Sequence, residues 1–278
     1  MQNNGFLLIE SEGLSYYACA AFQRDPGLRH GFSTRIGGVS PGPAGAWNLN
    51  LGNTAWDAQA NVLENRRRFL SALQFRPESL ATVAQVHSAD FHIIKGAAHQ
   101  WNPRTEGDAL ATTEAGVALA VQVADCFPVL LADPQTGAIA AVHTGWRGTL
   151  QRILGRTLAG MRRELGVDPS RVLVAIGPGI RRCCLEVGPD EAAAFEAAYP
   201  GEKLSSPRPE SPGKHFLDLP AALDIQLREV GVHPGNVSDL GLCTRCRPQE
   251  FFSYRAEGSR AGRMMAVIGK EKTDSTGP

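Results

Sequence analysis

The chain has 278 residues, of which 43% are hydrophobic and 20% charged, which is enough apolar sequence for a full hydrophobic core. Lys and Arg together number 28, as do Asp and Glu, so the bulk charge favours neither a nucleic acid nor an anionic membrane as a partner. No apolar run reaches the roughly 18 residues of a transmembrane helix, and the apolar start is too short for a signal peptide.

Six cysteines in a chain of this length favour reduced thiols over a disulfide scaffold, which predicts a cytoplasmic protein.

Apolar periodicity and turn residues predict the secondary structure. In chain order, we expect a helix over 58–73, strands over 116–123, 128–133 and 138–143, a helix over 150–165, a strand over 171–177, helices over 189–199 and 219–230, and a last strand over 263–269. Thr149 and Asp218 are the expected N-caps of the second and fourth helices.

The elements do not alternate regularly between strand and helix, which favours an α+β fold with a mixed β-sheet core layered against helices. We expect one catalytic domain over 1–278. Residues 200–214 contain four prolines and are expected to form a surface loop, and residues 271–278 a flexible tail.

The loop "PQTG" between two predicted strands has the length of a hairpin connection. If Asp133 pairs with Ala138, Pro128 lies opposite His143, and Cys126 shares the face of His143. Their Cα atoms would then be about 8 Å apart, which suits two ligands of one metal ion. A shift of one residue in this register would separate them.

A third ligand is needed, and His87 in "AQVHSAD" is the candidate. One Cys and two His with an open fourth position form a known catalytic zinc set. The spacing is diffuse, however. Spacing alone therefore favours a structural role over metal binding. In that interpretation Cys126 is a small buried residue and the two histidines are hydrogen-bonded strand ends.

The segment "HTGWRG" brings several functional side-chain types together before a predicted helix. Arg147 and Gly148 would precede its N-terminus, where backbone N–H groups bind anions, and Gly148 would permit close backbone approach. Trp146 would stack on a base or pack in the core. Arg35, in a second glycine-rich turn, is the other candidate to hold phosphate or a carboxylate.

The remaining cysteines favour packing over function. Cys183 and Cys184 would diverge on a strand and be buried. Cys243 and Cys246 form one CxxC, which without a second such pair is weak support for a structural zinc site.

Seven motifs resemble, in one order, the bacterial peptidoglycan-editing-factor family, also called laccase-domain or purine nucleoside phosphorylase proteins. They are "HGFSTRIGGVS", "NLNLG", "QVHSAD", "ADCFPVLLAD", "AVHTGWRGT", "AIGPGI…CCLEVG" and "FFSYR…GRMMAVI". The resemblance implies that His87, Cys126 and His143 bind one Zn²⁺ per chain, with copper as a possible substitute. It also implies a catalytic role for Cys126 and His143 and an acid/base role for Asp125, although a regular strand would point Asp125 away from the metal.

The resemblance implies phosphorolysis of adenosine, inosine and methylthioadenosine, and deamination of adenosine. The expected partners are purine nucleosides and phosphate, with no nucleic acid and no membrane, and the chain is expected to be a monomer or a weak homodimer.

Three other functions compete with this interpretation. A metal-free Cys–His hydrolase would remove a misloaded amino acid from a UDP-MurNAc cell-wall precursor, as the family name suggests. A multicopper oxidase would need a histidine-rich cluster, whereas this chain has seven histidines and no HxH pair, so we reject it. A nucleoside-binding module without turnover remains the alternative from another class.

Overall fold

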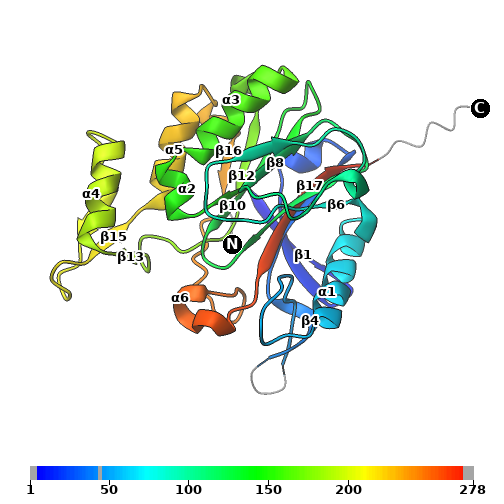
Figure 1. The fold of residues 1–278 in the computed structure, drawn as a ribbon, viewed down its shortest axis with the longest axis horizontal. Helices are drawn as coiled ribbons and strands as arrows, with labels where there is room; N and C mark the ends of the chain where they lie inside the picture. The colour runs from blue at the N-terminus through cyan, green and yellow to red at the C-terminus, as the bar shows by residue number, and fades with distance from the viewer. Residues whose placement is uncertain (1–4, 43–45, 272–278) are drawn as a thin grey trace, which may run out of the picture.

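A computed structural model describes residues 5–42 and 46–271, so most of the predicted tail lies outside the described residues. The architecture is α+β, as predicted, but the strands form two large mixed sheets instead of one (Figure 1). None of the described helices is both long and apolar enough to cross a bilayer.

The first sheet has six strands. Its order is β1 (Phe6–Ser11), β2 (Leu14–Cys19), β3 (Leu28–Ser33), β17 (Met264–Lys270), β9 (Ala118–Val123) and β6 (Leu80–Ala81). All pairs are antiparallel except β6 with β9.

The second sheet also has six strands. Its order is β16 (Val237–Asp239), β12 (Leu173–Ile176), β10 (Phe127–Ala132), β11 (Ile139–Thr144), β8 (Ala109–Thr112) and β7 (Phe91–Ile93). The outer pairs β12–β16 and β7–β8 are parallel, and the central pairs are antiparallel.

Two smaller sheets and six helices complete the described fold. The small sheets are β13 (Glu186–Val187), β15 (His215–Leu217) and β14 (Ser205–Pro207), and β4 (Ile36–Pro41) with β5 (Trp47–Asn48). The helices are α1 (Gln59–Ala72), α2 (Trp146–Leu150), α3 (Ile153–Leu165), α4 (Pro189–Ala198), α5 (Leu219–Glu229) and α6 (Tyr254–Glu257). Strand β14 lies inside the segment that we predicted to be loop throughout.

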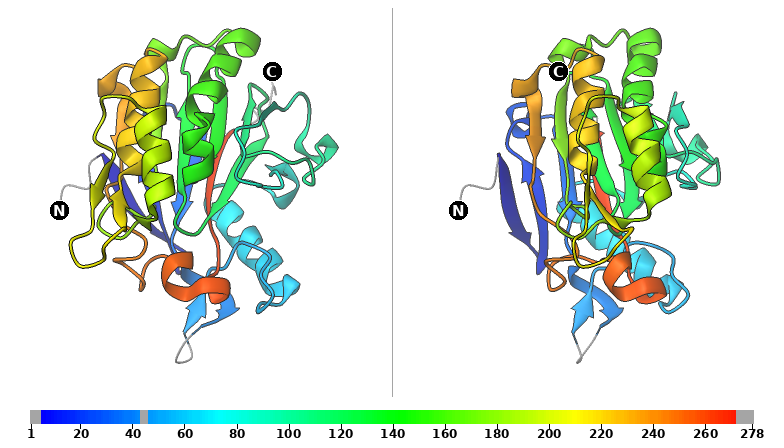
Figure 2. Two further views of the ribbon diagram at one scale, coloured as in Figure 1. Left: turned by 60° about the vertical axis from the view of Figure 1, so that its left-hand side comes forward. Right: turned by 90° about the vertical axis from the view of Figure 1, so that its left-hand side faces the viewer.

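The two large sheets pack face to face, with helices on their outer faces. In β10, Val129 and Leu131 pack with α3 and α5, whereas Leu130 packs with residues of the first sheet, as the two-residue period of a strand requires. Helix α1 covers the other face of the first sheet (Figure 2). Because β10 and β11 are buried on both faces, their sequences are apolar up to His143 and Thr144 at the end of β11.

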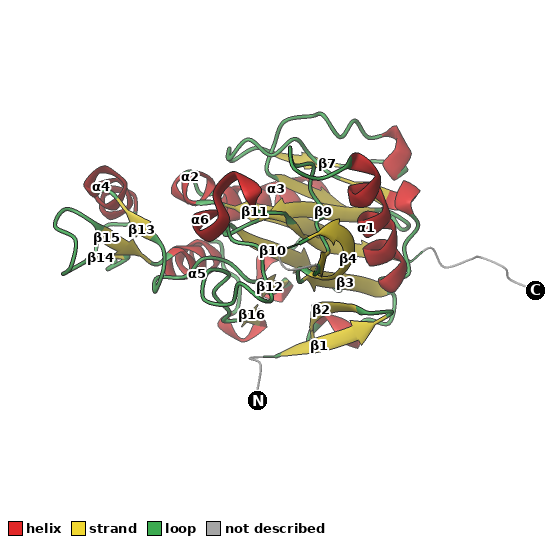
Figure 3. Ribbon diagram, turned by 90° about the horizontal axis from the view of Figure 1, so that it is seen from below, coloured by secondary structure: helices red, strands yellow, loops and turns green. Residues whose placement is uncertain are grey.

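Helix α4 and the small sheet β13–β15–β14 stand at one side of this body (Figures 1 and 3). They are inserted in the chain between β12 and β16 of the second sheet. The predicted helices at 58–73, 189–199 and 219–230 are confirmed to within one or two residues, and Asp218 caps α5 by accepting from the Ala221 N–H.

The predicted helix at 150–165 differs from the structure at its start. Helix α2 begins at Trp146 with Gly145 as N-cap, and Arg152, at φ 63°, separates it from α3. Thr149 is therefore inside α2 and caps nothing. At the break, the Thr149 carbonyl accepts from the Arg152 N–H, and also from the Tyr199 hydroxyl and the Gln226 amide.

Candidate metal centre and active site

The hairpin register that we predicted is confirmed. Pro128 is paired with His143, and the Asp133 N–H donates to the Ala138 carbonyl. His143 lies on the face of β11 that looks toward the first sheet, and Cys126, just before β10, packs against the same core between the sheets. The two side chains therefore meet at one end of the space between the sheets.

His87 reaches this position from the loop between β6 and β7. Its φ is 60°, a left-handed conformation that costs a non-glycine residue free energy unless the surroundings hold it. The backbone N–H groups of Val86, His87 and Ser88 all donate to the carboxylate of Asp108. This carboxylate therefore holds the strained turn that presents His87.

The three predicted ligands form a compact group. The donor atoms of His87, Cys126 and His143 all lie within 4.8 Å of one another, and the distance from Cys126 Sγ to His87 Nε2 is 4.0 Å. His143 Nδ1 donates to Asp108 Oδ1 at 2.7 Å, which leaves Nε2 of His143 available as the ligand atom. Such a group could hold a metal ion.

Sequence reasoning missed Asp108, although it positions both histidines. It has no exposed surface, and its own carbonyl accepts from the His143 N–H as well. A sequence signal was present: an aspartate directly before a buried apolar strand must find several partners, because a buried charge without them is costly.

The pKa values of Cys126 and His143 are strongly shifted. Burial alone would raise the pKa of the Cys126 thiol, but the adjacent His143 and His87 lower it to about 6. Burial alone would lower the pKa of His143, but the Cys126 thiolate and the Asp108 carboxylate raise it to about 9. Cys126 is therefore favoured as the thiolate, the form that binds metals and acts as a nucleophile.

Two glycines of the "HTGWRG" segment allow this close packing. A Cβ on Gly145 would lie 2.9 Å from Cys126 Sγ and 3.0 Å from His87 Cδ2, and a Cβ on Gly148 would lie 2.8 Å from the Ser88 carbonyl oxygen. Gly148 is buried in α2, and its lack of a side chain lets α2 pack against the turn that carries His87 and Ser88.

The candidate metal centre opens into a cavity of about 660 Å³. Trp146 and Arg147 both line it, and the Arg147 guanidinium stacks on the indole at 4.5 Å. Arg255 and Arg263 line it as well. Within the described part of the chain, these three guanidinium groups form no ion pair, and those of Arg255 and Arg263 donate only to backbone carbonyl groups.

The family model that matches the chain, described as multi-copper polyphenol oxidoreductase laccase, covers residues 29–271. The chain belongs to this laccase-domain family. A relative from Deinococcus radiodurans, named purine nucleoside phosphorylase, is 43% identical over 241 residues, which are 86% of this chain and 88% of that protein. Another relative, adenosine deaminase RL5 from an unknown prokaryotic organism, is 33% identical and covers 85% of this chain and 92% of its own length.

The fold of this laccase-domain protein is also that of solved relatives. The crystal structure of YlmD from Geobacillus stearothermophilus superposes with a TM-score of 0.84 at 34% identity, covering 97% of this chain and all of that chain. That relative is named a purine nucleoside phosphorylase as well.

Asp125 lies beside the candidate metal ligand Cys126 and lines the cavity. Its φ of 90° supplies the bend that its predicted role required. Both carboxylate oxygens already accept hydrogen bonds, one from the Thr244 hydroxyl at 2.6 Å and one from the Arg255 N–H at 2.6 Å. The Asp125 carbonyl accepts from the Ile180 N–H.

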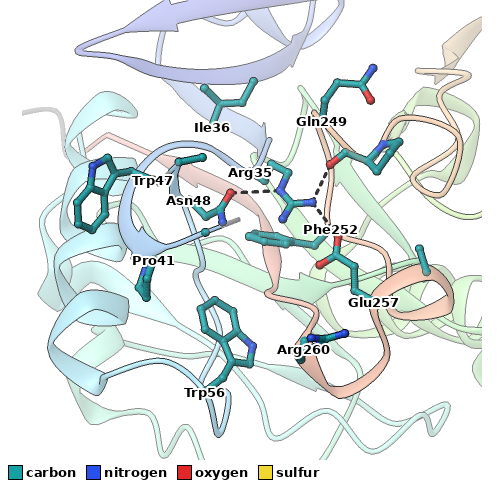
Figure 4. A pocket seen from close by; sticks show the side chains of 14 residues that line it. Arg35, Ile36, Pro41, Trp47, Asn48, Trp56, Gln249, Phe252, Glu257 and Arg260 are labelled. Carbon is teal, nitrogen blue, oxygen red and sulfur yellow. Dashed lines mark hydrogen bonds and ion pairs between the residues drawn. The ribbon is translucent and has the colours of Figure 1, made fainter. Parts of the chain in front are cut away.

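Arg35 does not line the cavity of the three predicted metal ligands. It lines a second cavity of about 980 Å³ with Trp47, Trp56 and Phe252 (Figure 4). Its guanidinium donates to Asn48 Oδ1, to the Pro248 carbonyl and to Glu257 at 2.7 Å. These acceptors neutralise the charge of the Arg35 guanidinium and use its donors. Arg35 and Arg147 line different cavities, so the structure does not bring them together.

The other cysteines also differ from expectation. Cys183 and Cys184 lie in a turn and not on a strand, and Cys183 is exposed. The turn brings both of them beside Cys243 and Cys246.

Proposed function

We propose that the chain is a zinc-dependent purine nucleoside phosphorylase that acts on adenosine, inosine and methylthioadenosine and also deaminates adenosine. The observation that carries this proposal is the juxtaposition, in one cavity, of three side chains that could hold a metal ion with three arginines that pair with no carboxylate among the described residues. The names of the relatives support the substrate class.

Zinc fits the donor set. One thiolate and two imidazoles leave the fourth position of a tetrahedral ion open for substrate, and copper could replace zinc on the same ligands. Asp108 fixes the tautomer of His143, as outer partners of zinc ligands commonly do. When bound, the ion would act as a Lewis acid that polarises the reacting group of the substrate.

The arginines would hold phosphate, the anionic co-substrate of phosphorolysis. Arg147 is exposed at the cavity, and its planar guanidinium can form two parallel hydrogen bonds to a phosphate. Arg255 and Arg263, from the C-terminal part of the chain, add positive charge to the same cavity. Trp146 would stack on the purine base, and positioning of the two substrates would provide much of the rate.

Asp125 contributes to this proposal as a positioning residue. Its carboxylate accepts from the Thr244 hydroxyl and the Arg255 backbone N–H, and these two hydrogen bonds would fix the bend that presents Cys126 to the cavity.

Steady-state kinetics with inosine plus phosphate, and with adenosine alone, test the proposal. Arg147→Ala should reduce phosphorolysis by about 10- to 150-fold, the effect of losing a charge-assisted hydrogen bond, and affect deamination less. Arg147→Lys should restore part of the loss. Arg163→Ala, on the exposed face of α3, is the matched control and should change neither reaction.

Metal analysis and Arg35→Ala complete the test. Cys126→Ala should lose the metal of this site and both activities. Arg35→Ala should affect both reactions equally, through stability, because its guanidinium is already bound by Glu257. If Arg35→Ala reduces phosphorolysis but not deamination, Arg35 binds phosphate, as expected from the sequence. If the unmodified protein turns over no nucleoside, the proposal is refuted.

One observation favours a second candidate function. The arrangement matches the one that cysteine hydrolases use: Cys126 would be the nucleophile, His143 the base, and Asp108 the carboxylate that orients His143. This candidate is the hydrolase that removes a misloaded amino acid from a UDP-MurNAc precursor. Hydrolysis of such a precursor by chelator-treated protein without metal would favour it, since a cysteine that ligates zinc is not a free nucleophile.

A further inference from the structure

A second group of thiols lies outside the cavity just described. The Sγ atoms of Cys183, Cys184, Cys243 and Cys246 all lie within 4.8 Å of one another. Cys246 Sγ is 3.6 Å from Cys183 Sγ and 3.4 Å from Cys184 Sγ. A disulfide requires about 2.05 Å between sulfurs, so all four cysteines are free thiols.

Backbone contacts between two turns hold these thiols together. One turn follows β12 and the other follows β16, the parallel neighbour of β12. Gly179 forms a parallel bridge with Cys243, and the Thr244 N–H donates to the Gly179 carbonyl. The Arg181 N–H points at Cys243 Sγ, at 3.5 Å, a contact that stabilises a thiolate ligand.

We propose that these four thiolates bind a second zinc ion, with a structural role. Zn–S bonds of about 2.3 Å in a tetrahedron place the sulfurs about 3.8 Å apart. Cys246 Sγ lies at 3.6 Å and 3.4 Å from two of its neighbours, and all four Sγ atoms lie within 4.8 Å of one another. A closed set of four cysteines with no open position is typical of structural zinc. This proposal does not rest on the proposed function, because the ligands and the cavity belong to different sites.

The charges around the cluster suit such an ion. Four thiolates and one Zn²⁺ carry a net charge of −2, and arginines adjoin the cysteines in both turns. Arg182 and Arg245 are exposed and form no ion pair with a described carboxylate. Positive neighbours favour thiolates over thiols, so these two arginines would compensate the charge of the bound site.

The proposed four-cysteine zinc site would also stabilise the candidate active site. Thr244, inside the CxxC turn, has no exposed surface and donates to Asp125, while Ile180, on the other turn, donates to the Asp125 carbonyl. Zinc would therefore lock together the two turns that hold Asp125 and, through it, Cys126. The same ion would link the two ends of the long chain segment that carries α4, α5 and the small sheet.

Metal content measured on protein purified without added metal, in reducing buffer, tests the proposal. We expect two zinc ions per chain in the unmodified protein and one fewer in Cys246→Ser and in Cys183→Ser. Cys19→Ala is the matched control, because Cys19 is a buried cysteine in β2 that belongs to neither group, and it should retain both ions. Cys126→Ala should lose only the other ion, which separates failure of this proposal from failure of the proposed function.

Stability and spectroscopy give readouts that do not depend on activity. Cys246→Ser should lower Tm by about 5 to 15 °C, as loss of a cross-link that closes a long loop does. Cobalt substitution of the unmodified protein should give the intense visible bands of a tetrahedral tetrathiolate, which covers the case in which a variant does not fold. Zinc content unchanged in Cys246→Ser, cobalt spectra without tetrathiolate bands, or a disulfide among the four cysteines in reducing buffer would each overturn the proposal.

Discussion

Asp108 has no exposed surface, yet its carboxylate accepts from three consecutive N–H groups of the His87 turn and from the ring of His143. Asp108→Asn would remove the charge and turn an NH₂ group toward at least one of these donors. We expect metal affinity to fall about 10- to 100-fold, measured by competition with a chelator.

Asp133→Asn is the matched control for this prediction. Asp133 is equally buried and also holds a turn, by accepting from the Gln135 N–H and the Thr136 hydroxyl, but it lies at the far end of the hairpin. Equal losses of metal affinity in both variants would mean that Asp108 acts only through general stability.

His30 makes stability depend on pH. It is buried and accepts from the Cys19 N–H, and burial lowers its pKa to about 4. Below pH 6.5 the unfolded chain binds a proton that the folded chain does not, so stability falls as pH decreases toward 4, by about 2 kcal/mol between pH 7 and pH 5.

His30→Gln keeps an acceptor but does not titrate. Its free energy of unfolding in urea should therefore fall less between pH 7 and pH 5 than that of the unmodified protein. An identical decrease in both proteins would assign the acid sensitivity to other groups.

At the scale of elements, the step from β11 into α2 determines whether the three predicted metal ligands can approach one another. Gly145 has a φ of −81°, which any residue can adopt, so the requirement for glycine here is one of space. Gly145→Ala would press a methyl group against Cys126 Sγ and the ring of His87. We expect at least about a tenfold loss of metal affinity with folding retained.

Gly155→Ala provides the comparison, since Gly155 lies in α3, where an added Cβ meets only Val230 Cγ1, at 3.6 Å. It should raise stability by about 0.5 to 1 kcal/mol through better helix propensity and leave metal binding unchanged. If Gly145→Ala binds metal as tightly as Gly155→Ala does, the crowding argument is wrong.

At the scale of the whole molecule, we predict one cooperative unfolding transition. Leu130 packs between the two sheets and Leu131 packs under the helices, so the same strand joins both halves of the core. Leu130→Ala and Leu131→Ala should each cost about 2 to 5 kcal/mol and shift a single calorimetric transition.

Leu63→Ala removes the same side chain from the surface of α1, where Leu63 is 57% exposed, and should change stability by less than about 0.5 kcal/mol. Two separate transitions, each moved by only one of the core variants, would contradict the prediction of a single domain.

The sequence by itself determined the parts of this protein that depend on neighbouring residues. Strand periodicity and a loop of hairpin length placed His143 opposite Pro128, and hence on the face of Cys126, because alternation along a strand is local geometry. Caps and apolar periodicity located α1, α4 and α5 for the same reason.

Only the tertiary structure decided which distant segments meet. The separation of Arg35 from Arg147, the convergence of four cysteines and the role of Asp108 all depend on how two sheets pack and on where loops cross their ends. Such contacts join residues far apart in the chain, and their partners are selected by burial, charge compensation and space. Those quantities exist only once the layers have assembled, so a single sequence read locally cannot supply them.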